Sequence, residues 1–76
     1  MDKDIRLINL SARIMVYTFS LKELTLQMKK IEQDTQTPVK ERLLEIRKIK
    51  TELDKVSEAI DNIKKEIKLL NTYNLN

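Results

Sequence analysis

The chain has 76 residues and contains no cysteine, histidine or glycine, and its 15 basic and 12 acidic residues leave a net charge of +3. Chains this short rarely build a core worth more than ~3–5 kcal/mol without disulfides, a metal ion or oligomerisation. Without cysteine and histidine, disulfides are excluded and the best zinc ligands are missing, so oligomerisation remains as the source of stability.

The first predicted element is a helix over about residues 4–32. Asp2 or Asp4 can cap its N-terminus, because a carboxylate there accepts backbone N–H groups and complements the helix dipole. The apolar spacing of the helix ends before a polar segment at residues 33–37, which we predict to be the turn. The absence of glycine favours an all-α chain with very few turns.

The second predicted element is a helix over about residues 38–72. Thr37 followed by Pro38 is typical of an N-cap and a first helical position. The polar tail at residues 73–76 should fray, because nothing in its composition would hold it against the rest of the chain. The whole chain is therefore interpreted as a single helical-hairpin domain.

Apolar residues recur in alternating steps of three and four along both helices, which is the pattern of a coiled-coil seam. A short turn makes the helices antiparallel neighbours, so the two seams should pack together in a two-helix hairpin. Folding about residue 35 places Leu24 opposite Ile46 and Ile31 opposite Val39. The predicted seam comprises Leu7, Leu10, Ile14, Tyr17, Leu21, Leu24, Met28, Ile31, Ile46, Ile49, Leu53, Val56, Ile60 and Ile63.

The first helix carries a second apolar stripe, interrupted only by Lys22, that lies roughly opposite the seam at about 100° per residue. A helix that is apolar on two sides is buried on two sides, and one hairpin partner covers only one of them. We therefore predict assembly into a four-helix bundle or a larger helical assembly. The second helix should overhang the first, which leaves its C-terminal apolar residues, Tyr73 included, with little cover. The predicted partner interface comprises Ile5, Ile8, Ala12, Met15, Phe19, Leu26, Ile67 and Leu70.

Basic residues concentrate around the turn, where residues 22–50 carry eight Lys/Arg against five Asp/Glu. A hairpin that dimerises into a four-helix bundle is similar in architecture to the plasmid-copy-number Rop proteins, which bind paired RNA loops, although no Rop motif is matched here. The resemblance implies an alternative function in nucleic-acid binding, but the three aromatic residues lie outside the basic cluster, so stacking partners for RNA are missing there. The candidate nucleic-acid residues are Lys29, Lys30, Lys40, Arg42, Arg47 and Lys48.

The composition offers little to catalysis, because Ser-His and Cys-His pairs, P-loops and Rossmann turns all need residues that this chain lacks. We expect no enzyme activity, cofactor, metal or small-molecule ligand. The leading hypothesis is a non-catalytic helical interaction protein, such as an adaptor, a small chaperone or an assembly subunit. Its partner would be a second copy, in a homodimer or homotetramer, or a heterologous helical protein.

The sequence predicts no membrane span, because its longest purely apolar run covers only residues 14–17. The residues after Met1 include both acidic and basic side chains and lead into no continuous apolar stretch, which is a poor secretory signal. We therefore expect a cytoplasmic protein. A peripheral membrane helix that lays the stripe from Ile5 to Phe19 on lipid is a third hypothesis, weakened by the modest charge beside that stripe.

Overall fold

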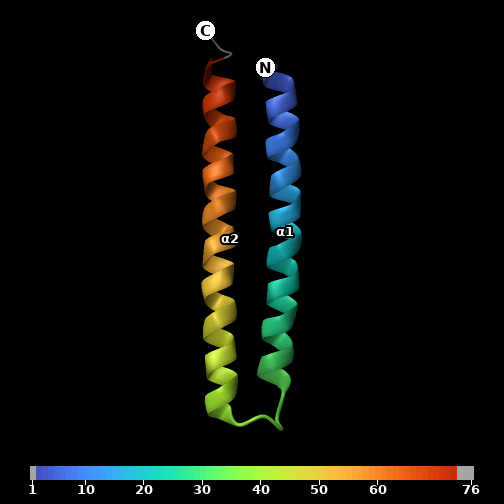
Figure 1. Cartoon of the computed structure of the whole chain (residues 1–76), viewed down its shortest axis with the longest axis vertical. Coiled ribbons are helices and arrows are strands. Elements are labelled where there is room, and N and C mark those ends of the chain that lie inside the picture. The colour runs from blue at the N-terminus through green and yellow to red at the C-terminus, as the bar shows by residue number, and fades with distance from the viewer. Residues whose placement is uncertain (1, 74–76) are drawn as a thin grey trace.

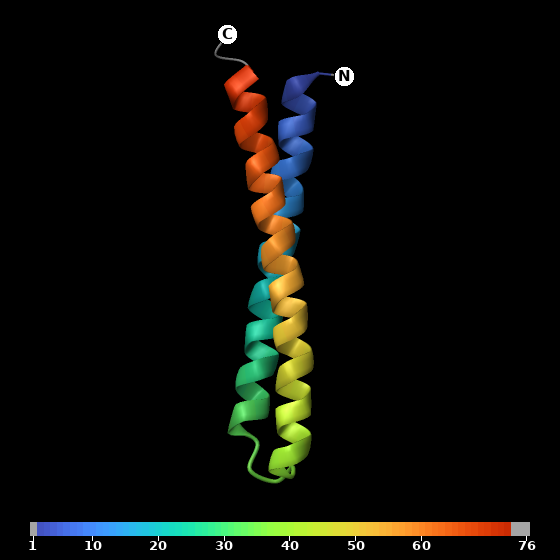
Figure 2. The same ribbon diagram turned by 90° about the vertical axis from the view of Figure 1, so that its left-hand side faces the viewer.

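The computed structural model describes residues 2–73, with Tyr73 placed by its backbone alone. Two helices, α1 (Lys3–Gln33) and α2 (Val39–Tyr73), lie antiparallel and side by side, with both termini at the same end of the molecule (Figure 1). The helices cross at a shallow angle (Figure 2) and form a rod with dimensions of 59 × 16 × 14 Å. The prediction of an all-α antiparallel hairpin is confirmed, and each helix bound lies within one residue of its expected position.

Asp2 caps the N-terminus of α1. Its Oδ1 accepts a hydrogen bond from the backbone N–H of Asp4 at 3.1 Å, which satisfies one of the amides that the first turn of a helix leaves unpaired. Asp4 lies inside the first turn, where its negative charge complements the helix dipole. Of the two caps that the sequence offers, the structure therefore uses Asp2.

The turn is organised by the carboxylate of Asp34. Its Oδ1 accepts backbone hydrogen bonds from Gln36 at 2.9 Å and Thr37 at 3.3 Å, and its Oδ2 accepts from the Thr37 hydroxyl. These three donors favour the ionised form, so the pKa of Asp34 is lowered, with the Thr37 hydroxyl as the largest cause. A single side chain thus holds the backbone of residues 34–37 in place of helical hydrogen bonds.

The start of α2 differs by one residue from the sequence prediction. Thr37 was expected to be the N-cap and Pro38 the first helical residue, but the helix begins at Val39. The Thr37 hydroxyl donates to Asp34, and the carbonyl of Pro38 accepts the first helical bond, from the Arg42 N–H at 3.1 Å. Because its hydroxyl is hydrogen-bonded to Asp34, Thr37 does not cap α2.

The two apolar seams meet along the line of contact between the helices. Among the residues described, only Leu10, Ile49, Ile60 and Ile63 are buried, and the other predicted seam residues are half-buried. The seam is incompletely covered because a pair of helices has only one line of contact, so each seam side chain meets neighbours from one direction. The hairpin on its own therefore has a thin core.

The register of the seam is shifted from the expected one. Arg6 on α1 forms an ion pair with Glu66 on α2, and Leu24 lines the same hollow as Ile49 rather than Ile46. Facing residues thus have numbers that sum to about 72 instead of 70. The shift arises because the Asp34 turn keeps residues 34–38 out of both helices, which moves the midpoint of the hairpin from residue 35 to residue 36.

The shifted register corrects three expectations. Val39 does not face Ile31, because Val39 is exposed and the half-buried side chain on that turn of α2 belongs to Arg42. The overhang of α2 is also small, because the first turn of α1 reaches the same end of the rod (Figure 1). Ile67 and Leu70 are accordingly half-buried rather than left bare. The tail expected to fray comprised residues 73–76, but the backbone of Tyr73 belongs to α2; the Tyr73 side chain and residues 74–76 lie outside the described part of the chain.

Candidate interaction surface

One side of α1 is apolar and uncovered. We define the α1 outer face as Ile5, Ile8, Ala12, Met15, Val16 and Phe19, all of which are exposed. Met15 is 73% exposed, Ile8 67% and Phe19 64%, which are high fractions for large apolar side chains on one stretch of helix. Leu26 extends this side toward the turn but is less exposed.

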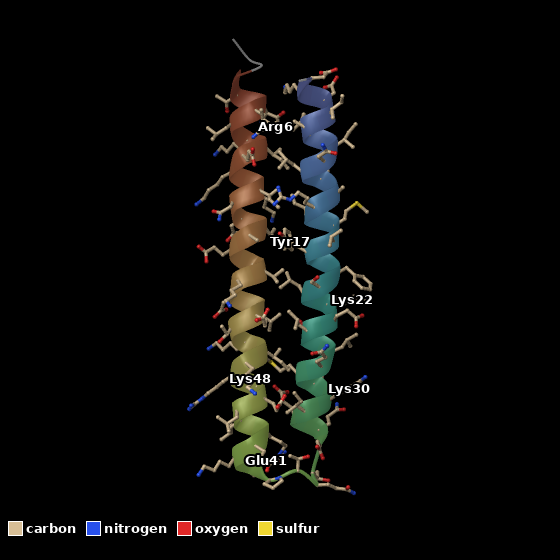
Figure 3. All side chains as sticks on the ribbon, in the orientation of Figure 1. Arg6, Tyr17, Lys22, Lys30, Glu41 and Lys48 are labelled. Carbon is tan, nitrogen blue, oxygen red and sulfur yellow. The ribbon has the colours of Figure 1, made fainter. Side chains whose placement is uncertain are left out.

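Helical spacing explains why these residues share a side. Steps of three and four from Ile5 through Phe19 keep to one surface of α1, offset by two residues from the seam and therefore roughly opposite it. Figure 3 shows the two sides: Tyr17 lies toward α2, whereas Lys22 projects from the side of α1 away from α2. Lys22 also marks the point where the α1 outer face gives way to charged residues.

The outer side of α2 is polar over most of its length. Its exposed positions between residues 47 and 68 include Arg47, Lys48, Thr51, Asp54, Lys55, Glu58, Asp61, Asn62, Lys65 and Lys68. Such a helix has one apolar stripe and one solvated side, which is the pattern of a surface helix. Only α1, in its N-terminal two-thirds, has two apolar sides, so the asymmetry between the helices identifies where a further protein surface would fit.

The exposed side chains forgo a substantial free energy. Burying a large apolar side chain completely is worth ~1.5–3 kcal/mol, so one that is about two-thirds exposed forgoes ~1–2 kcal/mol. Four such side chains on the α1 outer face (Ile8, Met15, Val16 and Phe19) together forgo ~4–8 kcal/mol per chain. That amount is comparable to the whole stability of a small domain. Covering this face would therefore stabilise the folded state by an amount of that size.

Two shallow hollows flank the ridge of side chains on the α1 outer face. One, with a volume of about 250 Å³, is lined by Ala12, Arg13, Val16 and Tyr17. The other, of about 370 Å³, lies beside Met15 and Phe19 and ends at Lys22. Both are open, mostly apolar depressions between successive helical turns, of the kind that accepts a side chain from a second helix. They are too open to enclose a small molecule.

The structure places the predicted partner interface in two parts. The six residues on α1, from Ile5 to Leu26, lie together on one side of the rod. Ile67 and Leu70 are half-buried in the seam of α2 and do not join them. Ile67 and Leu70 are covered because the register shift brings the first turn of α1 level with them.

Several exposed apolar residues were missed at the level of the sequence. Val16 extends the α1 outer face. It lies four residues after Ala12 and three before Phe19, and this helical spacing could have assigned it to the same side of α1. Leu43 and Leu44 lie on the turn half of α2 beside Lys40 and Arg47. Val39 is exposed one helical turn before Leu43, and Leu69 is exposed near the C-terminal end of α2.

The basic residues near the turn lie on both helices. Lys29 and Lys30 belong to α1, and Lys40, Arg47 and Lys48 to α2, all of them exposed; Figure 3 shows Lys30 and Lys48 on their separate helices. Arg42 is half-buried, and its Nε is buried against the turn that Asp34 organises. One of the six candidate nucleic-acid residues thus takes part in the turn, and the rest are divided between two helices.

Within residues 2–73, no group of three or more carboxylates is arranged to hold a metal ion. The one carboxylate with a shifted pKa, Asp34, owes that shift to hydrogen bonds that shape the turn. Neither α1 nor α2, as described, contains a segment long and apolar enough to cross a membrane. The feature that stands out on the described surface is therefore the α1 outer face.

Comparison of the chain with protein-family models, with curated proteins and with solved structures finds no match. The similarity to Rop proteins accordingly stays one of architecture.

Proposed function

We propose that this chain is a non-catalytic helical interaction protein whose α1 outer face binds an apolar helical surface. In this role it would serve as an adaptor, a small chaperone or a subunit of a helical assembly. The partner covers α1 on the side that α2 leaves bare and thereby completes a bundle of more than two helices. The same contact supplies the stability that the thin seam lacks.

The observation that carries the proposal is the exposure of Ile8, Met15 and Phe19 on a side of α1 opposite the seam. Exposed apolar side chains scattered over a surface are ordinary, but a continuous row along three to four helical turns is typical of an interface. The row is also regular in helical spacing, so its complement is another helix that contacts residues three and four positions apart.

The experiment compares two triple variants. In the first, Ile8, Met15 and Phe19 are all replaced by glutamine, which keeps good helix propensity and removes the apolar side chains. In the matched control, Thr51, Asp54 and Glu58, on the outer side of α2, are replaced by glutamine. Light scattering coupled to size-exclusion chromatography gives the mass of each variant, and circular dichroism gives its helix content and thermal melting.

The proposal predicts that the unmodified chain and the α2 control associate, either with further copies of themselves or with an added helical partner. The α1 variant should associate with neither. It also predicts that the α1 variant loses any dependence of its melting temperature on protein concentration. An unmodified chain that is monomeric and well folded, and that has the same mass and melting curve as the α1 variant, would refute the proposal.

A further inference from the structure

We propose that the α1 outer face is covered by a second copy of this chain, packed antiparallel to the first with a two-fold axis beside Ala12. This inference rests on the proposed function and specifies its partner and its geometry. Two copies of α1 then form the centre of the assembly, and each α2 lies on the far side of its own α1. The contact is isologous, so each residue pair across it occurs twice.

The α1 outer face is complementary to itself in this arrangement. An antiparallel two-fold beside Ala12 pairs residues whose numbers sum to 24, so Ile5 lies opposite Phe19 of the second copy. Ile8 lies opposite Val16 in the same way, and Ala12 meets its own counterpart. The smallest apolar side chain on this side of α1 therefore sits at the axis, where small residues let two helices approach most closely.

The hollows on α1 fit this pairing. The depression of about 250 Å³ beside Ala12 and Val16 lies where Ile8 of the second copy would insert. The depression beside Met15 and Phe19 lies at the level of Ile5 to Asn9 of the second copy. Each copy thus offers both the protruding side chains and the recesses that receive them, as packing of ridges into grooves requires.

Charge favours the antiparallel over the parallel arrangement. Lys22 ends the α1 outer face toward the turn, and the acidic N-cap Asp2 lies at its other end, and both residues are exposed. In the antiparallel pairing Lys22 lies level with Asp2 of the second copy, so opposite charges meet at each end of the contact. A parallel pair would instead bring the two Lys22 side chains together, and like charges across an interface are repulsive.

The extent of the apolar residues sets how far the two copies overlap. They are concentrated between Ile5 and Phe19, so the overlap covers about residues 2–22, or ~30 Å of helix at 1.5 Å per residue. The five large side chains of the face each present on the order of 100 Å², so two copies bury roughly 1,000 Å², near the lower bound for a specific interface. The turn halves of both hairpins project beyond the overlap.

The staggered dimer has a distinctive length. A single hairpin is 59 Å long. With the axis beside Ala12, the turns point in opposite directions and the dimer spans about 90 Å, as follows from the helical rise of ~1.5 Å per residue. A parallel dimer, or an antiparallel one in full overlap, stays near the length of one hairpin. Small-angle X-ray scattering on the unmodified chain separates these arrangements.

Single-cysteine variants test the pairing directly, because the chain has no cysteine of its own. Ala12→Cys places a thiol at the axis, where two copies lie close enough for a disulfide. Under mild oxidation we expect at least tenfold more disulfide dimer from Ala12→Cys than from the control Glu58→Cys, which lies on the outer side of α2. A mixture of Ile5→Cys and Phe19→Cys should give a mixed dimer in excess of the homodimer of either variant.

Four results would overturn this geometry. Phe19→Cys that forms a disulfide with itself as readily as Ala12→Cys does would indicate a parallel pair. A maximum dimension near 60 Å for an associated chain would contradict the stagger. A chain that is monomeric and poorly folded alone would exclude the second copy while leaving the α1 outer face as a surface for another protein. A monomer that is stably folded at all concentrations would overturn both this inference and the proposed function.

Discussion

Replacing Phe19 with alanine should weaken self-association of the chain by roughly 30- to 700-fold while leaving each hairpin helical. Phe19 is exposed on the α1 outer face and takes no part in the seam with α2. Truncating it therefore removes nothing that holds α1 to α2. Alanine also has a higher helix propensity than phenylalanine, so α1 itself should not be weakened.

The magnitude follows from the exposed fraction of the side chain. Phe19 is 64% exposed in the hairpin, and complete burial of a large apolar side chain is worth ~1.5–3 kcal/mol, so association recovers ~1–2 kcal/mol per copy. A symmetric dimer contains two copies of the substitution and loses ~2–4 kcal/mol in total. Since each ~1.4 kcal/mol changes an equilibrium constant tenfold, the dissociation constant rises by the range given above.

Sedimentation equilibrium over a range of protein concentrations measures this dissociation constant, and circular dichroism on the same samples reports helix content. Leu44→Ala is the matched control, because Leu44 is also an exposed apolar residue but lies on the turn half of α2, outside the proposed contact. A dissociation constant for Phe19→Ala within threefold of the parent chain, or an equal effect of Leu44→Ala, would refute the reasoning.

Three further perturbations test the hairpin itself. Leu10 is only 4% exposed in the seam, so Leu10→Ala should cost ~2–5 kcal/mol in urea denaturation, and a loss below ~1 kcal/mol would show that the seam does not hold α1 to α2. The lowered pKa of Asp34 means that its contribution to stability is present above the unfolded-state pKa and lost as the pH falls through the folded-state value, below 3.8. An NMR titration of Asp34 should show that midpoint, and Thr37→Val should raise it; a midpoint at or above 3.8 in the parent chain would contradict the turn geometry. The ion pair of Arg6 with Glu66 is about half exposed, so Glu66→Gln should change the free energy of unfolding by less than ~1 kcal/mol, and a larger effect that persists in high salt would be inconsistent with a solvated pair.

The hairpin could be predicted from the sequence because helical spacing is a local property. Alternating steps of three and four mark the side of each helix that faces the other, and the residues on those steps, such as Leu10 and Ile60, are the ones that the structure buries. The second stripe on α1 is visible in the same way, since Ile8, Met15 and Phe19 fall on the opposite side. Neither inference requires knowledge of contacts between distant residues.

The register could not be predicted to the same accuracy, because it depends on how many residues the turn removes from the helices. The hydrogen bonds of Asp34 with Gln36 and Thr37 set that number, and spacing does not reveal them. The resulting shift exposes Val39 and covers Ile67 and Leu70, so it changes which residues are available to a partner. The spacing of residues in one chain specifies only the kind of surface that would fit the α1 outer face, and not the molecule that carries it.

The central claim is that α1 has more apolar surface than α2 can cover, so the folded state depends on association. The most direct test is the sedimentation-equilibrium mass of the unmodified chain, measured together with its melting temperature, from about one to several hundred micromolar. We predict a dimer or larger assembly whose melting temperature rises with concentration. A monomer of 9.0 kDa that melts cooperatively at a temperature independent of concentration would contradict the account.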